Sequence, residues 1–293
     1  KKFRAVQVYE ALYKRRIKSF DDMTNISKEV REKLKQDFSF YKIKMLIKQK
    51  GKNVNKYLFE LEDGNKIESV LMFHDYGTSI CVSSQVGCNM TCAFCESGRL
   101  KKVRNLLAYE IVQQILQIEE DINKRITHVV LMGIGEPFDN YDNVLRFVKI
   151  INCGKGIDIG SRHITISTCG VIPGIKKFMN EEGQVNLAIS LHAPNDALRS
   201  RIMPINKAYP LNELMETIKE YINKTNRRVT FEYIMLDNVN DSEENAKELA
   251  LLLKGINCYV NLIPYNETEN IEFKRTKEWK IMKFYDILKK NKI

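Results

Sequence analysis

The spacing of apolar residues changes along the chain and predicts two kinds of structure. Over residues 3–50 apolar positions recur every three or four residues, which predicts two or three short amphipathic helices. After that region, apolar segments of strand length begin. The helical spacing is carried by Val6, Tyr9 and Tyr13 and again by Ile26, Val30 and Leu34, with Ser27 as an expected N-cap.

The apolar segments after residue 50 predict a hairpin and then a parallel sheet. Segments 56–62 and 67–73 flank Asp63-Gly64, a dipeptide typical of hairpin turns. From residue 79 strands alternate with helices, which predicts an α/β fold whose sheet is open or curled into a partial barrel. The expected strands are 79–83, 127–133, 163–168, 186–191, 228–235 and 259–264, and the expected helices lie near 107–119, 141–151, 173–180, 211–223, 242–254 and 277–290.

This pattern divides the chain into three predicted parts. Residues 1–50 form a helical domain, residues 51–78 a β-hairpin extension, and residues 79–293 the α/β domain. In parallel α/β folds the functional side chains lie at the carboxyl ends of the strands. Polar residues that follow the predicted strands are therefore candidates for a functional site.

Charge is concentrated in the first of these parts. The net charge is +10, and residues 1–50 hold 15 Lys and Arg against 6 Asp and Glu, whereas the rest holds 32 against 31. Such a local positive field attracts a polyanion, most often nucleic acid. A solvated helix surface without a partner explains the charge equally well. No apolar run reaches about 18 residues, so no membrane span is expected.

Three of the seven cysteines lie close together and indicate a metal centre. Cys88, Cys92 and Cys95 have C-x3-C-x2-C spacing after the first expected strand of the α/β domain. Thiolates select zinc or iron–sulfur clusters. A structural zinc site needs four ligands, and Cys81 or His74 could supply the fourth. A cluster held by three cysteines instead leaves one iron open to a substrate.

The loop with Phe94 before its last cysteine resembles the radical S-adenosylmethionine (SAM) superfamily. The stretch 81–88, Cys-Val-Ser-Ser-Gln-Val-Gly-Cys, is similar to the RNA adenine methyltransferases that modify C2 (RlmN) or C8 (Cfr). The resemblance covers nearly the whole chain in collinear order. It continues through residues 3–5 and 23–25, Met132–Pro137 (MGIGEP), Ser167–Gly170 (STCG), Ser190–Asn195 (SLHAPN) and Asn261–Asn266 (NLIPYN).

The resemblance implies the fold, the cofactors and their ligands. It implies a partial (β/α)6 radical-SAM barrel with a [4Fe-4S] cluster on Cys88, Cys92 and Cys95, and two SAM molecules per turnover, one of them yielding a 5′-deoxyadenosyl radical. Taken alone, the Gly133-x-Gly135 pattern is a tight turn and His192 a satisfied core or turn residue. The resemblance implies that SAM is contacted by Gly135, Glu136, Ser167, Ser190, Leu191, His192 and Asn266.

Two further residues receive catalytic roles from the same resemblance. Cys81 would be the thiol that resolves a cysteine-linked RNA intermediate and leaves a disulfide, and Glu68 would accept a proton. By pattern alone, Cys81 is a small buried strand residue and Glu68 a strand carboxylate that faces solvent. The family also uses a methyl-carrying cysteine beyond Asn266. No cysteine follows Cys258, so we expect the carrier to lie beyond Ile293.

The implied activity is methylation at C2 of an adenine in 23S ribosomal RNA, and of an adenine in transfer RNA, by a cytoplasmic monomer. An external electron donor such as flavodoxin or ferredoxin would reduce the cluster. The alternatives are a C8-specific enzyme and a non-catalytic RNA-binding relative without the carrier cysteine. An enzyme that activates a glycyl radical conflicts with the stretch 81–88 and with the basic N-terminus.

Overall fold

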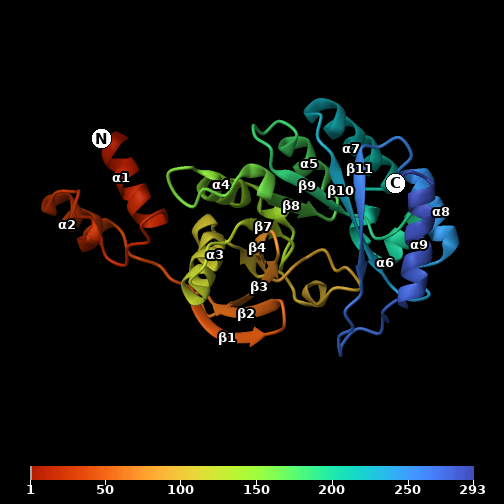
Figure 1. Ribbon diagram of the computed structural model, residues 1–293, viewed down its shortest axis with the longest axis horizontal. Helices are drawn as coiled ribbons and strands as arrows, with labels where there is room; N and C mark the ends of the chain where they lie inside the picture. The colour runs from red at the N-terminus through yellow and green to blue at the C-terminus, as the bar shows by residue number, and fades with distance from the viewer. Residues whose placement is uncertain (1) are drawn as a thin grey trace. The chain divides into compact units, whose positions relative to one another are not determined.

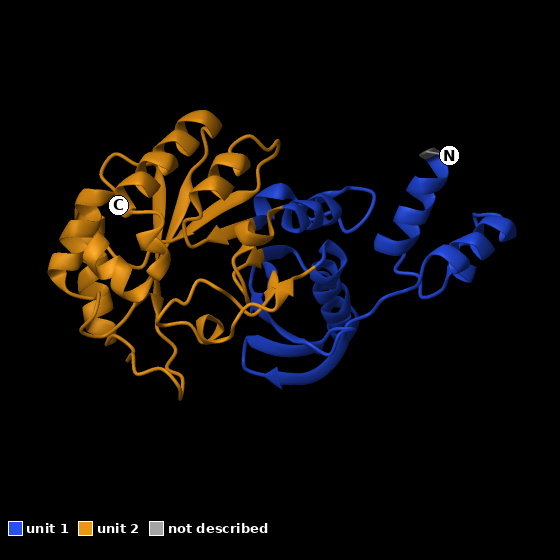
Figure 2. Cartoon of the chain, turned by 180° about the vertical axis from the view of Figure 1, so that it is seen from behind, with its two compact units in different colours: residues 1–82, 107–129, 142–164 blue, residues 83–106, 130–141, 165–293 orange. Residues whose placement is uncertain are grey.

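The computed structural model describes residues 2–293 (Figure 1). They form two compact units, which Figure 2 shows in different colours. Each unit combines segments that are distant in the sequence. The first consists of Lys1–Val82, Leu107–Val129 and Asp142–Ile164, and the second of Ser83–Leu106, Val130–Tyr141 and Thr165–Ile293. The three domains expected from the sequence pattern stay a prediction, and the two units are described separately below.

The first unit begins with a small helical module. Its elements are α1 (Lys2–Tyr13), the 3-10 turn η1 (Phe20–Asp22) and α2 (Lys28–Asp37). Ser19 caps η1 in a capping box, whereas Ser27, the expected N-cap of α2, makes no capping hydrogen bond with its side chain. The module has a core of its own, formed by Ala11, Phe20, Met23 and Ile26 with Val8, Leu12, Ile17, Val30 and Leu34 around them.

An antiparallel sheet follows the helical module. The expectation that the helical region extends to residue 50 was wrong, because residues 44–50 form strand β1 (Lys44–Lys50). The expected hairpin is confirmed as β2 (Val54–Glu60) and β3 (Lys66–His74), joined through Gly64 at φ +79°. Strand β4 (Gly77–Cys81) pairs antiparallel with β3.

The remaining elements of the first unit are helical. Helix α3 (Ala108–Ile122) buries Ile111, Val112, Ile115 and Ile118, which recur at helical spacing. Most of α4 (Tyr141–Asn152) and the 3-10 turn η4 (Ser161–His163) also belong here. Strand β7 (His128–Leu131) leads from this unit into the second one.

A parallel sheet forms the framework of the second unit. Its strands β8 (Ile164–Thr168), β9 (Asn186–Ser190), β10 (Val229–Met235) and β11 (Cys258–Pro264) pair in this order. The helices α5 (Ile172–Phe178), α6 (Asp196–Ile202), α7 (Leu211–Thr225), α8 (Glu243–Leu252) and α9 (Glu278–Lys290) belong to the same unit, with the short turns η3 (Pro137–Asn140) and η5 (Pro204–Lys207). The carboxyl ends of parallel strands meet at one edge of a sheet.

The alternation of strands and helices predicted from residue 79 is confirmed, and the fold is α/β with a mostly parallel central sheet. Helix α6 was missed, because its seven residues are too short for a helical period to be recognised. Among the described residues, none of the helices is both long enough and apolar enough to cross a membrane.

Candidate cofactor site

The cysteine loop lies in the second unit, between the two-residue strand β5 (Gln85–Val86) and the 3-10 turn η2 (Glu96–Arg99). Backbone hydrogen bonds fold it tightly: the Cys88 N–H donates to the Leu100 carbonyl at 2.9 Å, and the Cys95 N–H to the Cys92 carbonyl at 3.1 Å. Gly87 has φ +72°, and a Cβ there would lie 2.1 Å from the carbonyl oxygen of Lys101. Only glycine fits that turn, which directs the chain into the loop.

The three thiols of this loop influence one another electrostatically. The pKa of Cys92 is raised to about 12, mostly by burial and in part by the neighbouring Cys95 and Cys88. Burial likewise raises the pKa of Cys88. Within residues 2–293 no three His, Cys, Asp or Glu side chains are arranged with the geometry of a metal site. Three thiols are nevertheless suitable ligands for an iron–sulfur cluster. Metal binding deprotonates them, and the positive charge of the metal offsets the repulsion between the thiolates.

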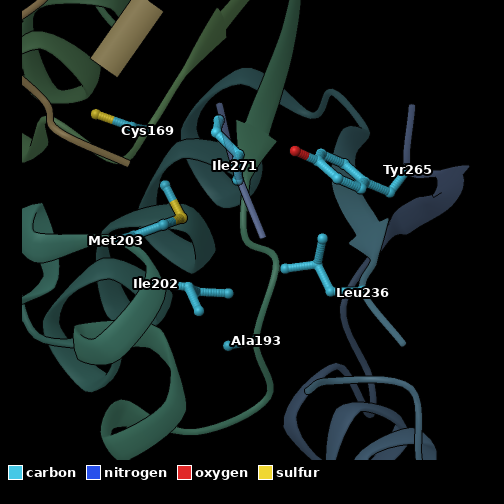
Figure 3. Packing of buried hydrophobic residues seen from close by; sticks show 7 residues of the cluster. All are labelled: Cys169, Ala193, Ile202, Met203, Leu236, Tyr265 and Ile271. Atoms are coloured by element: carbon cyan, nitrogen blue, oxygen red, sulfur yellow. The ribbon is translucent and has the colours of Figure 1, made fainter. Parts of the chain in front are cut away.

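The cysteine loop packs on a buried cluster at the carboxyl ends of the parallel strands. Figure 3 shows this cluster of seven side chains, which come from the segments after β8, β9, β10 and β11, from the end of α6 and from the residue that follows α6. From the loop, Met90, Cys92 and Phe94 pack against it. The cluster consists of Cys169, Ala193, Ile202, Met203, Leu236, Tyr265 and Ile271. The fold thus brings the candidate cluster ligands to the strand edge where polar residues were expected.

Glu136, the first polar candidate at this edge, is a buried carboxylate held by backbone groups. One carboxylate oxygen accepts from the Phe138 N–H at 3.0 Å and the other from the Cys169 N–H at 2.8 Å. Burial raises the pKa of Glu136, whereas the hydrogen bonds from Cys169 and Phe138 lower it. Gly135 has φ +105°, and a Cβ there would lie 2.5 Å from the Cβ of Gln85. The glycine therefore permits close packing of the two segments.

Gln85 organises the same edge and was not singled out in the sequence. Its side-chain oxygen accepts from the Glu136 N–H at 2.9 Å, and its amide nitrogen donates to Asn105 at 2.8 Å. Gln85 is fully buried. Its place in the matched stretch 81–88 was the only available signal, since a strand Gln is usually read as exposed.

His192 adopts a left-handed conformation after β9 and has a defined tautomer. Its Nδ1 accepts from the Ile234 N–H at 3.0 Å, which leaves the proton on Nε2. Burial, and next the charge of Arg199, lower the pKa of His192 to about 3, so the ring is neutral. Phe94 of the cysteine loop meets the ring edge-to-face at a centroid distance of 4.9 Å. His192 is thus a satisfied turn residue that still presents one N–H donor.

The other SAM candidates occupy different environments. Ser167 is buried near the end of β8, Ser190 is half-buried at the end of β9, and Leu191 follows it in the core. Asn266, after β11, is exposed. The structure therefore gathers the strand-end candidates in the second unit, with Asn266 on its surface.

Cys81 and Glu68 belong to the first unit, where they share one face of the antiparallel sheet. Cys81 is the register partner of Val70 in β3, and Glu68 lies two residues from Val70, on the same side of the strand. The Glu68 side chain is 40% exposed and forms an ion pair with Lys56 at 2.7 Å. Cys81 is half-buried, not buried as its sequence pattern alone predicts. Glu68 is also half-buried, not fully exposed to solvent.

Some basic residues of the N-terminal segment form ion pairs with carboxylates within the first unit. Arg16 pairs with Glu119 at 2.5 Å, and Lys18 and Lys42 pair with Glu120 at 2.7 and 3.0 Å. These ion pairs tie the helical module to α3. Residues 1–50 as a whole, with 15 Lys and Arg against 6 Asp and Glu, carry most of the net positive charge of the chain.

Comparison with known proteins decides between the metal-site alternatives. A model of the radical SAM superfamily matches residues 82–250, and one of the ribosomal RNA large subunit methyltransferase N-terminal domain matches residues 1–39. A "probable dual-specificity RNA methyltransferase RlmN" from Spiroplasma citri is 54% identical over 297 residues, which cover 100% of this chain and 86% of that protein. The chain belongs to the RlmN family.

Further relatives agree with membership of the RlmN family. The protein of the same name from Streptococcus thermophilus is 55% identical, over 99% of this chain and 77% of that protein. The crystal structure of a radical SAM methyltransferase from Sphaerobacter thermophilus superposes with a TM-score of 0.94 at 41% identity, covering 99% of this chain and 87% of that one. The chain is a radical SAM RNA methyltransferase with a [4Fe-4S] cluster and SAM as cofactors, and a structural zinc site is set aside.

Proposed function

We propose that this chain methylates C2 of an adenine in 23S ribosomal RNA and of an adenine in transfer RNA. One observation supports this most strongly: the three-thiol loop packs on the strand ends where Glu136 and His192 lie. The relatives carry the name of a dual-specificity RNA methyltransferase, and the sequence of residues 81–88 favours C2 over C8.

In this proposal the second unit binds both cofactors. Cys88, Cys92 and Cys95 hold the cluster, which together with SAM supplies a methyl group and radical chemistry when bound. The Nε2–H of His192 would donate a hydrogen bond to SAM, because its Nδ1 already accepts a hydrogen bond from the Ile234 N–H. The remaining SAM contacts are assigned to Gly135, Glu136, Ser167, Ser190, Leu191 and Asn266.

The first unit supplies the groups that act on the RNA adduct. Glu68 accepts the proton lost from the adenine, and its carboxylate forms an ion pair with Lys56 at 2.7 Å. Cys81 acts as the resolving thiol, and its attack requires the thiolate form and access to the adduct. Their position on one sheet face supports a shared role.

The basic helical module is proposed to contact RNA phosphates, which makes binding weaken as salt concentration rises. Target choice would then depend on RNA shape and on unstacked bases. We also propose that the protein acts in the cytoplasm as a monomer and receives electrons from a flavodoxin or ferredoxin.

The test is mass spectrometry of ribosomal and transfer RNA from cells with and without the gene. We expect 2-methyladenosine in both RNAs only when the gene is present. An 8-methyl product would replace C2 by C8 specificity, and a change in ribosomal RNA alone would remove transfer RNA as a substrate. Unchanged RNA would contradict the proposed activity.

A further inference from the structure

Arg199, in α6, is a fully buried arginine beside the cofactor site. Its side chain has 0% exposure, and it is the largest of the fully buried side chains. The guanidinium donates to four oxygens, all of them uncharged. These acceptors are the carbonyls of Cys169 at 2.7 Å, Leu191 at 3.1 Å and Ser190 at 3.2 Å, and the side-chain oxygen of Asn206 at 2.8 Å.

These bonds join the segments that surround the candidate SAM contacts. Cys169 follows β8, and Ser190 and Leu191 lie at the end of β9, directly before His192. The helix that carries Arg199 also holds the cysteine loop, because the Ala93 N–H donates to the Ile202 carbonyl at 2.9 Å. A planar fork with five donors can fix several carbonyls at once, which a lysine cannot do.

Among residues 2–293, no carboxylate is directly bound to the guanidinium of Arg199. The nearby Asp196 uses its Oδ1 for the side chain of Asn206 at 2.7 Å and for the Leu211 N–H at 2.8 Å. Burial lowers the pKa of Arg199, while the sulfur groups of Cys169 and Cys92, and next Asp196, oppose that shift. A buried cation is costly unless negative charge compensates it. Thiolates of the cysteine loop, once bound to a cluster, would supply such negative charge.

We propose that Arg199 is a positioning residue of the cofactor site, which holds the strand-end carbonyls in place and offsets the negative charge of the cluster and of the SAM carboxylate. The inference rests on the proposed assignment of Cys92 as a cluster ligand. Thiolates bound to the cluster and a carboxylate on SAM both add negative charge to this interior. Arg199 would supply the fixed opposite charge before either of them binds.

The test compares R199M, which removes the charge, with R199K, which keeps the charge but not the fork. Arg201→Met, on the exposed side of the same helix, is the matched control. Each protein is reconstituted anaerobically with iron and sulfide. The measurements are iron content, the cluster midpoint potential, the dissociation constant for SAM and the thermal stability of the cluster-free protein.

For R199M we expect a midpoint potential more negative than in the parent, because losing a nearby positive charge disfavours reduction. We also expect its dissociation constant for SAM to rise about tenfold or more, as loss of hydrogen bonds from a charged group predicts. R199K should keep the parent potential and weaken SAM binding severalfold, and R201M should match the parent. In R199M, parent values of both quantities would overturn the proposal.

If R199M does not fold, R199K and Asn206→Ala decide between the outcomes. A shifted potential in R199K would contradict the charge role, and parent SAM affinity would contradict the role of the fork. Asn206→Ala, which removes one acceptor of the fork and keeps the charge, should weaken SAM binding without moving the potential. Failure of the parent itself to take up iron would instead count against the proposed function.

Discussion

Glu68 and Glu136 are both assigned to the reaction, yet the structure places them in opposite environments. Glu68 lies on a half-exposed sheet face of the first unit and pairs with the flexible side chain of Lys56. Glu136 is 3% exposed in the second unit, where the backbone N–H groups of Phe138 and Cys169 fix both carboxylate oxygens. A carboxylate fixed by backbone has a structural role, whereas an exposed one contributes little to stability. We therefore expect Glu136 to stabilise the site, and Glu68 to take part in the reaction without stabilising the fold.

The largest effect is expected at the cysteine loop of the second unit. Cys92→Ser should abolish cluster loading and all cleavage of SAM, because serine is a poor substitute for a thiolate ligand. Iron content and absorbance after anaerobic reconstitution measure this. Cys258→Ser, a change in the same unit at β11, is the control and should load normally. Normal loading of C92S would remove Cys92 from the ligand set.

Glu68→Gln should separate activity from stability in the first unit. We expect RNA methylation to slow about a hundredfold, as loss of a proton acceptor predicts. The free energy of unfolding should change by less than about 1 kcal/mol, since the Lys56 ion pair is exposed. Methylation rates and urea unfolding measure the two effects. Lys56→Met removes the other partner of the same ion pair. Parent activity in E68Q would exclude Glu68 as the proton acceptor.

Glu136→Gln should show the reverse pattern in the second unit. Gln cannot accept from two backbone N–H groups with charged oxygens, so we expect the free energy of unfolding to fall by about 2 kcal/mol. Urea unfolding of the cluster-free protein measures this. Glu232→Gln is the matched control, because that buried carboxylate accepts from the side-chain amide of Asn261 at 2.8 Å, which Gln can also do. Equal stabilities of E136Q and E232Q would contradict the role of the backbone bonds.

His192→Asn should have the smallest effect on stability at neutral pH and should instead change the pH dependence of stability. The folded pKa of about 3 lies below the usual 6.5, so the unfolded chain binds the proton first and stability falls as pH drops from 6.5 towards 3. This residue should contribute about 1.4 kcal/mol per pH unit in that window. Asn keeps an acceptor for the Ile234 N–H and tolerates the φ of +61°. Unfolding curves at pH 7.5, 6 and 5 should be less acid-sensitive in H192N; equal sensitivity would be the contrary result.

The sequence predicted the main strands and helices because their apolar spacing matches the burial that the fold requires. Strand β1 escaped that reasoning, since Lys44, Lys48 and Lys50 occupy a strand whose register shifts between Met45 and Ile47. The cysteine loop and the strand-end candidates were accessible from motifs. Arg199 was not, because a sequence pattern gives no sign that an arginine in a seven-residue helix is buried.

The most direct test of the central claim is the product formed from SAM by the reconstituted protein under reducing, anaerobic conditions. The account predicts a brown protein that releases 5′-deoxyadenosine, with the product absent from C92S and retained in C258S. A colourless protein that binds one zinc ion and forms no 5′-deoxyadenosine would contradict it.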